Sequence, residues 1–363
     1  MKFNKKIKEL IIWMIKKFSL EGSLNSLNKL INHTKDSPAS KEIVFGYFKD
    51  SFGAKYDLIE GLRDQIKPGW ERSLEEKNYD EIPSHNEIQN NLSYSKNQID
   101  NLLRLLTISS IKITQKMDIL EIGASIGATT YQIASKNPNS VVGSEFVQYQ
   151  INQNAQRTNS NKIKDQEIKH TSLVRNEVST FFDDKISSKV SFIEDDICDS
   201  KIESNSKDLI LSWDTLEHLA NPKKAFEEMY RILKPGGFTF HEYNSFFSFN
   251  GGHSLCTLDF MWGHVRLSDK DFERYLKQFR PSEYDVAKRF YSNNLNRMTI
   301  NKLKQYIKKS GFKQVIFFPT INFDNYFNLT ENIFSDSKRN YPSLELIDLL
   351  SPSICIGLRK PIS

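Results

Sequence analysis

The sequence predicts an α/β fold in which a mostly parallel sheet carries helices on both faces. From residue 117 onward, short apolar runs alternate with helical segments, as they do in parallel sheets with helical crossovers. The first of these runs, 117–122, also ends in a turn of small residues that opens into a helix. Strand ends of this kind form nucleotide-binding corners in open α/β sheets.

The composition fits one large domain with additions, or two modest domains, in a chain of 363 residues. Three cysteines lie far apart without CxxC spacing, which argues against a disulfide framework and fits the cytoplasm. Residues 1–36 hold eight lysines and three acidic residues and carry the whole net charge of +5. The remaining chain is neutral, which argues against a broad nucleic-acid footprint.

Residues 3–18 have the pattern of a basic amphipathic helix, and a Ser/Asn-rich linker follows to about residue 40. The apolar residues at helical spacing are Phe3, Ile7, Leu10, Ile11, Met14, Ile15 and Phe18. Such a helix either packs on the body or a partner, or rests on an anionic membrane surface, and the sequence leaves both open. The apolar run 10–15 is too short to cross a bilayer.

Residues 37–116 are predicted to be mostly helical and are a candidate lid. Breaks are expected at Lys67-Pro68-Gly69 and Ile82-Pro83-Ser84. Strands are then expected at 117–122, 140–144, 189–193, 208–212, 238–243, 312–318 and 353–358. Helices are expected at about 127–136, within the polar stretch 146–188, and at 222–233 and 299–310. The long aromatic insertion 244–298 is the best candidate for an acceptor pocket, since long insertions in compact domains are more often functional than idle.

The turn Gly123-Ala124-Ser125-Ile126-Gly127 predicts the nucleotide-binding corner itself. Backbone N–H groups at a helix start have no partner within the helix, and small residues let a ligand approach them. Glu145 ends the second strand, where a carboxylate can accept hydrogen bonds from both ribose hydroxyls. Asp196 follows the third strand, where a carboxylate can bind an adenine amino group, and Asp195 competes for that role.

Three segments resemble the class I S-adenosylmethionine-dependent methyltransferases: LEIGASIGA, SFIEDDI and LILSWDTLEHLANPKKAFEEMYRILKPGG. The resemblance is close over 117–243 and looser over 299–360, and it is to the branch that methylates small molecules, lipids and sugars. It implies a Rossmann-like, seven-stranded sheet with an antiparallel last strand, in a domain that spans 117–363. It also implies S-adenosylmethionine as the cofactor.

The family's acidic-x-Gly-x-Gly-x-Gly motif maps to Glu121, Gly123, Ser125 and Gly127, so that Ser125 replaces a glycine. Serine is small enough for this turn and adds a hydrogen-bond donor. Trp213 follows the fourth strand and can line the cofactor pocket or contact the sulfonium. The expected cofactor-binding residues are Glu121, Gly123, Ala124, Ser125, Gly127, Glu145, Asp195, Asp196, Ile197 and Trp213.

The implied reaction is attack by an acceptor on the sulfonium methyl group, which requires mainly that the protein position two molecules. A hydroxyl acceptor would also need a general base. Four histidines follow the fourth and fifth strands, whose carboxyl ends face the crevice. They are His253 and His264, which rank first as the base, and His218 and His241. Each also has a structural interpretation, in a turn, a loop or a core.

No metal site is predicted, because the histidines lack close ligand spacing such as HxH or HxxxH. The leading functional prediction is methyl transfer to O or N of a small-molecule, sugar or lipid-linked acceptor. One alternative is an NAD(P)-dependent oxidoreductase, which would need a full GxGxxG and a second nucleotide half-site. The other is a non-catalytic cofactor-binding protein on the same fold. The sequence leaves the acceptor and the oligomeric state open.

Overall fold

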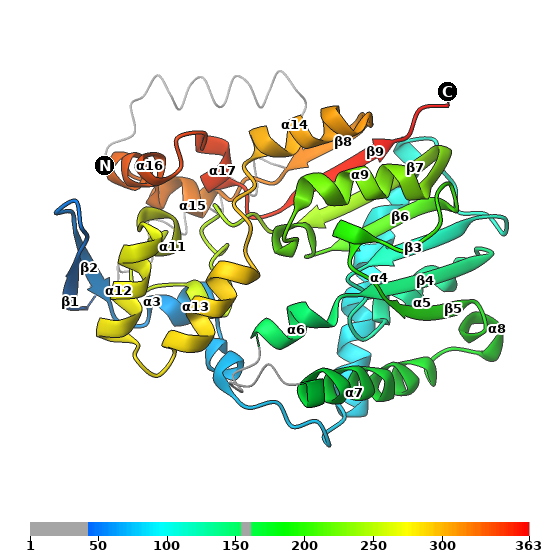
Figure 1. The fold of residues 1–363 in the computed structure, drawn as a ribbon, viewed down its shortest axis with the longest axis horizontal. Helices are drawn as coiled ribbons and strands as arrows, with labels where there is room; N and C mark the ends of the chain where they lie inside the picture. Colours follow the sequence, from blue (N-terminus) through cyan, green and yellow to red (C-terminus); the bar gives the residue numbers. More distant parts are fainter. Residues whose placement is uncertain (1–42, 154–160, 363) are drawn as a thin grey trace, which may run out of the picture.

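The computed structural model describes residues 43–153 and 161–362, which form two lobes side by side (Figure 1). One lobe surrounds a seven-stranded sheet, and the other is built from a β-hairpin and short helices. The predicted basic helix 3–18 and its linker lie outside the described residues. Within the described part of the chain, no helix combines the length and the apolar character needed to cross a membrane.

The large sheet has the strand order β5-β4-β3-β6-β7-β9-β8, and β9 runs antiparallel to both of its neighbours. The strands are β3 (Asp118–Ile122), β4 (Ser140–Glu145), β5 (Val190–Glu194), β6 (Lys207–Trp213), β7 (Leu233–Tyr243), β8 (Lys313–Pro319) and β9 (Ile354–Arg359). This confirms the predicted seven strands and the antiparallel last strand. The order reverses between β3 and β6, and ligands of open α/β sheets bind at the carboxyl ends of the strands beside such a reversal.

The sheet is covered on both faces because its central strands are apolar on both sides. Ile119 and Leu209 face the core formed with α4 (His85–Ile108) and α5 (Ala128–Ala134). Leu120 faces the opposite core, formed with α9 (Pro222–Ile232) and α14 (Ile300–Ser310). The remaining helices of this lobe are α6 (Val147–Gln153), α7 (Asn161–Ser179), α8 (Asp184–Ser187), η2 (Ile197–Asp199) and η3 (Leu216–His218).

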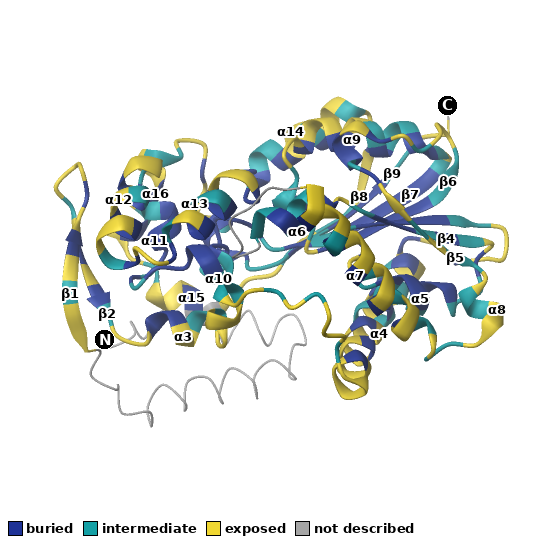
Figure 2. Cartoon of the chain, turned by 60° about the horizontal axis from the view of Figure 1, so that its bottom comes forward, coloured by how far each residue is buried: buried dark blue, intermediate teal, exposed yellow. Residues whose placement is uncertain are grey.

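The second lobe has a hydrophobic core of its own, drawn from three distant stretches of sequence. The hairpin contributes Phe48, Tyr56 and Leu58, and the other stretches lie within 246–295 and 333–349. The elements of this lobe and its connections are β1 (Val44–Lys49), β2 (Lys55–Ile59), α3 (Leu62–Ile66), η1 (Trp70–Leu74), α10 (His253–Cys256), α11 (Gly263–Arg266), α12 (Asp269–Phe279), α13 (Tyr284–Asn293), α15 (Phe323–Asn328), α16 (Glu331–Asn340) and α17 (Leu346–Leu350). The burial pattern is visible in Figure 2.

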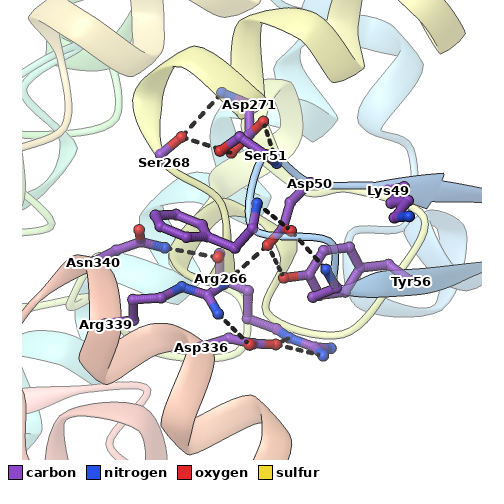
Figure 3. Close-up of polar contacts among 12 residues, drawn as sticks. Lys49, Asp50, Ser51, Tyr56, Arg266, Ser268, Asp271, Asp336, Arg339 and Asn340 are labelled. Carbon is purple, nitrogen blue, oxygen red and sulfur yellow. Dashed lines mark hydrogen bonds and ion pairs between the residues drawn. The ribbon is translucent and has the colours of Figure 1, made fainter.

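Buried ion pairs join these stretches (Figure 3). The Asp50 carboxylate, at the end of β1, accepts a hydrogen bond from the Tyr56 hydroxyl at 2.8 Å and pairs with Arg339 of α16 at 2.9 Å. Arg266 of α11 pairs with Asp336 of α16 at 3.0 Å. The hairpin, the insertion and the late helices are therefore held as one body.

The prediction of a mostly helical region 37–116 is wrong for residues 44–59, which form an antiparallel hairpin. β2 alternates exposed and buried residues, so that Tyr56 and Leu58 point into the core. This two-residue period is the signal of a half-buried strand, and Gly53, at φ +90°, makes the turn. The region is also divided between the lobes, since the hairpin belongs to the second lobe while α4 covers the sheet, and its role as a lid stays a prediction.

Candidate functional site

A cavity of about 710 Å³ lies at the carboxyl ends of the central strands. Most of the predicted cofactor residues line it: Gly123, Ser125, Glu145, Asp195, Asp196, Ile197 and Trp213. The site prediction from sequence therefore leads to a single place in the fold. Glu121, Ala124 and Gly127 do not line the cavity. Ala124 and Gly127 belong to the loop itself, and Glu121 is buried at the end of β3.

The loop after β3 is pressed against its neighbours at its glycines. Gly123 has φ +75°, and a Cβ there would lie 2.4 Å from Thr215 Oγ1. A Cβ on Gly127, at φ +82°, would lie 2.5 Å from the Phe192 ring. Ser125, which replaces a glycine of the motif, also takes a left-handed conformation at φ +45°. That conformation costs an L-residue about 1–2 kcal/mol. The backbone of the loop therefore has the conformation typical of a glycine, although a serine occupies the position.

Glu145 and Arg175 hold this loop from two sides. Glu145 Oε2 accepts a hydrogen bond from Ser125 N at 2.7 Å, and Arg175 of α7 donates from Nε to Ser125 O at 2.8 Å. Burial raises the pKa of Glu145, and the bond from Ser125 N and the charge of Arg175 oppose that rise. Sequence reasoning missed Arg175, because it lies on α7 outside any motif.

Glu121 is buried beneath the loop and ties β3 to α5. Its Oε2 accepts a hydrogen bond from the Thr130 hydroxyl at 2.5 Å. Burial raises the pKa of Glu121 to about 8, so its carboxyl group is mainly neutral at pH 7. Glu121 therefore shapes the loop and does not reach the cavity, although it was expected among the cofactor-binding residues.

Asp195, Asp196 and Trp213 supply polar atoms to the cavity wall. Asp196 Oδ1 accepts from Cys198 N at 2.9 Å and caps η2, and Asp195 Oδ1 accepts from Lys201 N at 2.9 Å. Asp195 Oδ2 and Trp213 Nε1 are buried with no hydrogen-bond partner among the described residues. Buried polar atoms are normally paired, so these two fit a polar ligand of nucleoside size.

Two of the four predicted catalytic histidines lie in hydrophobic cores and border neither this cavity nor the one described next. His241 Nδ1 is 2.7 Å from Ser212 Oγ and its Nε2 is 2.5 Å from Thr239 Oγ1, inside the sheet. His264 donates from Nε2 to Phe246 O at 2.9 Å. Burial lowers the pKa of His241 to about 3 and that of His264 to about 4. The structural interpretation holds for both, and the catalytic expectation is corrected.

A second cavity, of about 490 Å³, adjoins the first along α6. Tyr149, Gln150 and Gln153 line both cavities. The insertion supplies the stretch 253–255 and Phe290 to the second cavity. The insertion therefore lines part of this cavity, and residues 72–81 form much of the opposite wall. Its role as an acceptor pocket stays a prediction.

His218 lines the first cavity and His253 the second, and their ring centroids are 4.9 Å apart. His218 donates from Nδ1 to Asn294 O at 2.6 Å, which leaves its Nε2 with a free lone pair. Burial lowers the pKa of His218 to about 4 and that of His253 well below its usual value. Both imidazoles are therefore neutral at pH 7.

Glu217 lies directly behind the two histidines and was missed by sequence reasoning. Its Oε1 accepts from Asn244 N at 3.2 Å and is 3.9 Å from His218 Nε2. Its Oε2 and His253 Nε2 are both buried with no hydrogen-bond partner among the described residues. Burial raises the pKa of Glu217, and the negative charge of Asp214 raises it further. One ligand atom each from Glu217, His218 and His253 falls within 4.8 Å of the others.

Residues 120–241 match the family model of a methyltransferase domain. No curated protein matches the chain. Similar solved structures include a putative methyltransferase from Bacillus halodurans, at 14% identity over 72% of this chain and 99% of that one, with a TM-score of 0.38. Another is a putative S-adenosylmethionine-dependent methyltransferase from Listeria monocytogenes, at 12% identity over 74% and 99%, with a TM-score of 0.42.

The matched model covers the strands that carry the candidate cofactor cavity, from β3 to β7. The seven-stranded, mostly parallel sheet with its antiparallel last strand β9 is the sheet that the sequence resemblance implied. Residues 120–241 of the chain therefore match a methyltransferase domain, and this stretch carries most of the sheet around the candidate cofactor cavity.

Proposed function

We propose that this protein transfers the methyl group of S-adenosylmethionine to an oxygen or nitrogen atom of a small-molecule, sugar or lipid-linked acceptor. The observation that carries the proposal is the cavity at the carboxyl ends of the central strands, which gathers the glycine loop, Glu145 and the Asp195–Asp196 pair. Nothing in that wall requires a second nucleotide, which favours a single nucleoside over a dinucleotide.

Each part of this wall has a task toward the cofactor. Glu145 would accept from the ribose hydroxyls with the lone pairs that Ser125 N and Phe146 N leave free. Asp195 Oδ2 would accept from the adenine amino group, since it has no other partner among the described residues. The cofactor, when bound, supplies an electrophilic methyl group on a sulfonium centre.

The acceptor is proposed to enter through the second cavity and to meet the methyl group beside His218 and His253. In the transfer, the acceptor loses a proton and forms a bond to the methyl carbon. The carbon–sulfur bond breaks, and its electron pair stays on sulfur as a thioether. Alignment of two bound reactants is worth an effective molarity of about 10⁵–10⁸ M, so positioning can provide most of the rate.

Titration calorimetry of the full chain with S-adenosylmethionine, S-adenosylhomocysteine and NAD tests the proposal. Binding of the first two ligands, with a loss of affinity in Glu145→Gln, is expected. Glu177→Gln is the matched control, because Glu177 is exposed on α7. Binding of NAD alone would reject the proposal and favour the oxidoreductase alternative.

A further inference from the structure

We propose that Glu217, His218 and His253 bind a divalent transition-metal ion at the junction of the two cavities. The three residues come from two parts of the chain. Glu217 and His218 lie on η3, after β6, and His253 begins α10 in the insertion. Their ligand atoms fall within 4.8 Å of one another.

Each of the three side chains has a lone pair available to a metal. The Nδ1–H of His218 is bound to Asn294 O, which fixes the tautomer and leaves Nε2 free. Metal-binding histidines nearly always carry such a hydrogen bond on the other ring nitrogen. Glu217 Oε2 and His253 Nε2 are buried without partners in the described part of the chain, and a metal ion would satisfy both.

The donor set selects the class of metal. Two imidazoles and one carboxylate are typical ligands of Zn²⁺ and of other first-row transition ions, with a further position left open. Mg²⁺ and Ca²⁺ prefer a shell made of oxygen atoms. Around Zn²⁺ the ligand atoms of a tetrahedral site are about 3.4 Å apart, so the widest gap in this cluster would have to close by about 1.4 Å on binding.

The charge around the cluster is compatible with a cation. The charged neighbours that act on Glu217 are Asp214 and Lys67, and their charges oppose each other. A bound cation would favour the ionised form of the Glu217 carboxyl group, and that carboxylate would balance part of the charge of the ion.

The open position would face the acceptor, and this role rests on the proposed function. A metal ion lowers the pKa of a bound hydroxyl group, so an acceptor hydroxyl could release its proton to solvent and attack the methyl group without a histidine base. The metal site thus favours a hydroxyl acceptor over an amine.

Metal binding can be measured without any acceptor. The full chain is stripped with a chelator and titrated with Zn²⁺ or Mg²⁺, and Co²⁺ serves as the probe because it gives visible absorption bands on binding. We expect one equivalent of Zn²⁺ or Co²⁺, clearly tighter binding than of Mg²⁺, and a loss of affinity of at least about 100-fold in Glu217→Gln and His253→Gln. His85→Gln, at the start of α4, is the matched control.

S-adenosylmethionine affinity of the same variants separates a lost metal site from a lost fold. Variants that keep cofactor affinity and lose metal support the proposal. Wild-type protein without a one-equivalent site, or variants that bind metal as the wild type does, would overturn it. Metal binding in a protein that does not bind S-adenosylmethionine would keep the site and reject the proposed methyl transfer.

Discussion

The contacts that stabilise each lobe join residues at very different separations along the chain. In the sheet lobe, the loop after β3 is fastened by Glu145, only 20 residues beyond Ser125. In the second lobe, Asp50 pairs with Arg339 across 289 residues, and the Phe48 ring packs against Tyr275 with centroids 5.4 Å apart. The candidate cofactor cavity is formed mainly by segments that are close in sequence. The wall that the insertion gives to the second cavity depends on contacts between distant segments.

This difference explains why the cofactor side of the site is visible in local motifs and the acceptor side is not. A strand, a turn and a helix start leave a contiguous signature, because the ligand contacts their backbone and a few fixed side chains. A pocket assembled from distant segments has no such signature. Mutations should therefore affect the two sides differently, and the predictions below start with the largest effect.

Asp50→Ala should lower the free energy of unfolding by about 3–5 kcal/mol, because it removes a buried carboxylate that pairs with Arg339 and leaves the buried Tyr56 hydroxyl without its acceptor. Chemical denaturation followed by Trp fluorescence measures the change. Lys201→Ala is the control, because its pair with Asp199 is solvent-exposed and should matter little. Equal effects of the two substitutions would mean that the long-range network does not stabilise the second lobe.

Gly123→Ala should weaken S-adenosylmethionine binding by at least about 30-fold, because a Cβ at φ +75° is strained and overlaps Thr215. Ser125→Gly is the matched control, since it relieves the left-handed strain and should keep affinity within about a few-fold of the wild type. Titration calorimetry, at a temperature where both variants are fully folded, measures the two S-adenosylmethionine affinities. A Gly123→Ala variant with normal affinity would show that cofactor binding does not depend on the glycine conformation at residue 123.

Glu145→Gln should cost about 1.5–3 kcal/mol of cofactor binding, the usual value of hydrogen bonds to a charged group. The amide keeps the size of the side chain but offers one acceptor oxygen in place of two. The loss should be smaller for adenine than for adenosine, because adenine lacks the ribose. Equal losses for the two ligands would contradict ribose binding by Glu145.

The sequence identified the strands of the sheet correctly, because buried parallel strands are short apolar runs bounded by turn residues. It failed at 44–59, where the alternation in β2 is only five residues long and the ring that stacks on Tyr56, Phe260, lies about 200 residues away. It also failed to join Glu217 and His218 to His253. The insertion brings that imidazole back to the turn after β6, and no spacing rule predicts such a contact.

The last expected effect depends on pH and concerns His241, a predicted catalytic candidate that the structure buries in the sheet. Burial lowers its pKa in the folded protein from 6.5 to about 3, so between these values the unfolded chain binds a proton that the folded protein does not. Stability should then fall with decreasing pH, by up to about 1.4 kcal/mol per pH unit from this group. His241→Gln should flatten the slope between pH 6 and 4 in urea unfolding, and above pH 7.5 its difference from the wild type should not change with pH. If His241→Gln leaves the dependence of the unfolding free energy on pH unchanged, His241 must bind its proton equally well in the folded and unfolded protein. That result would contradict its burial in the sheet.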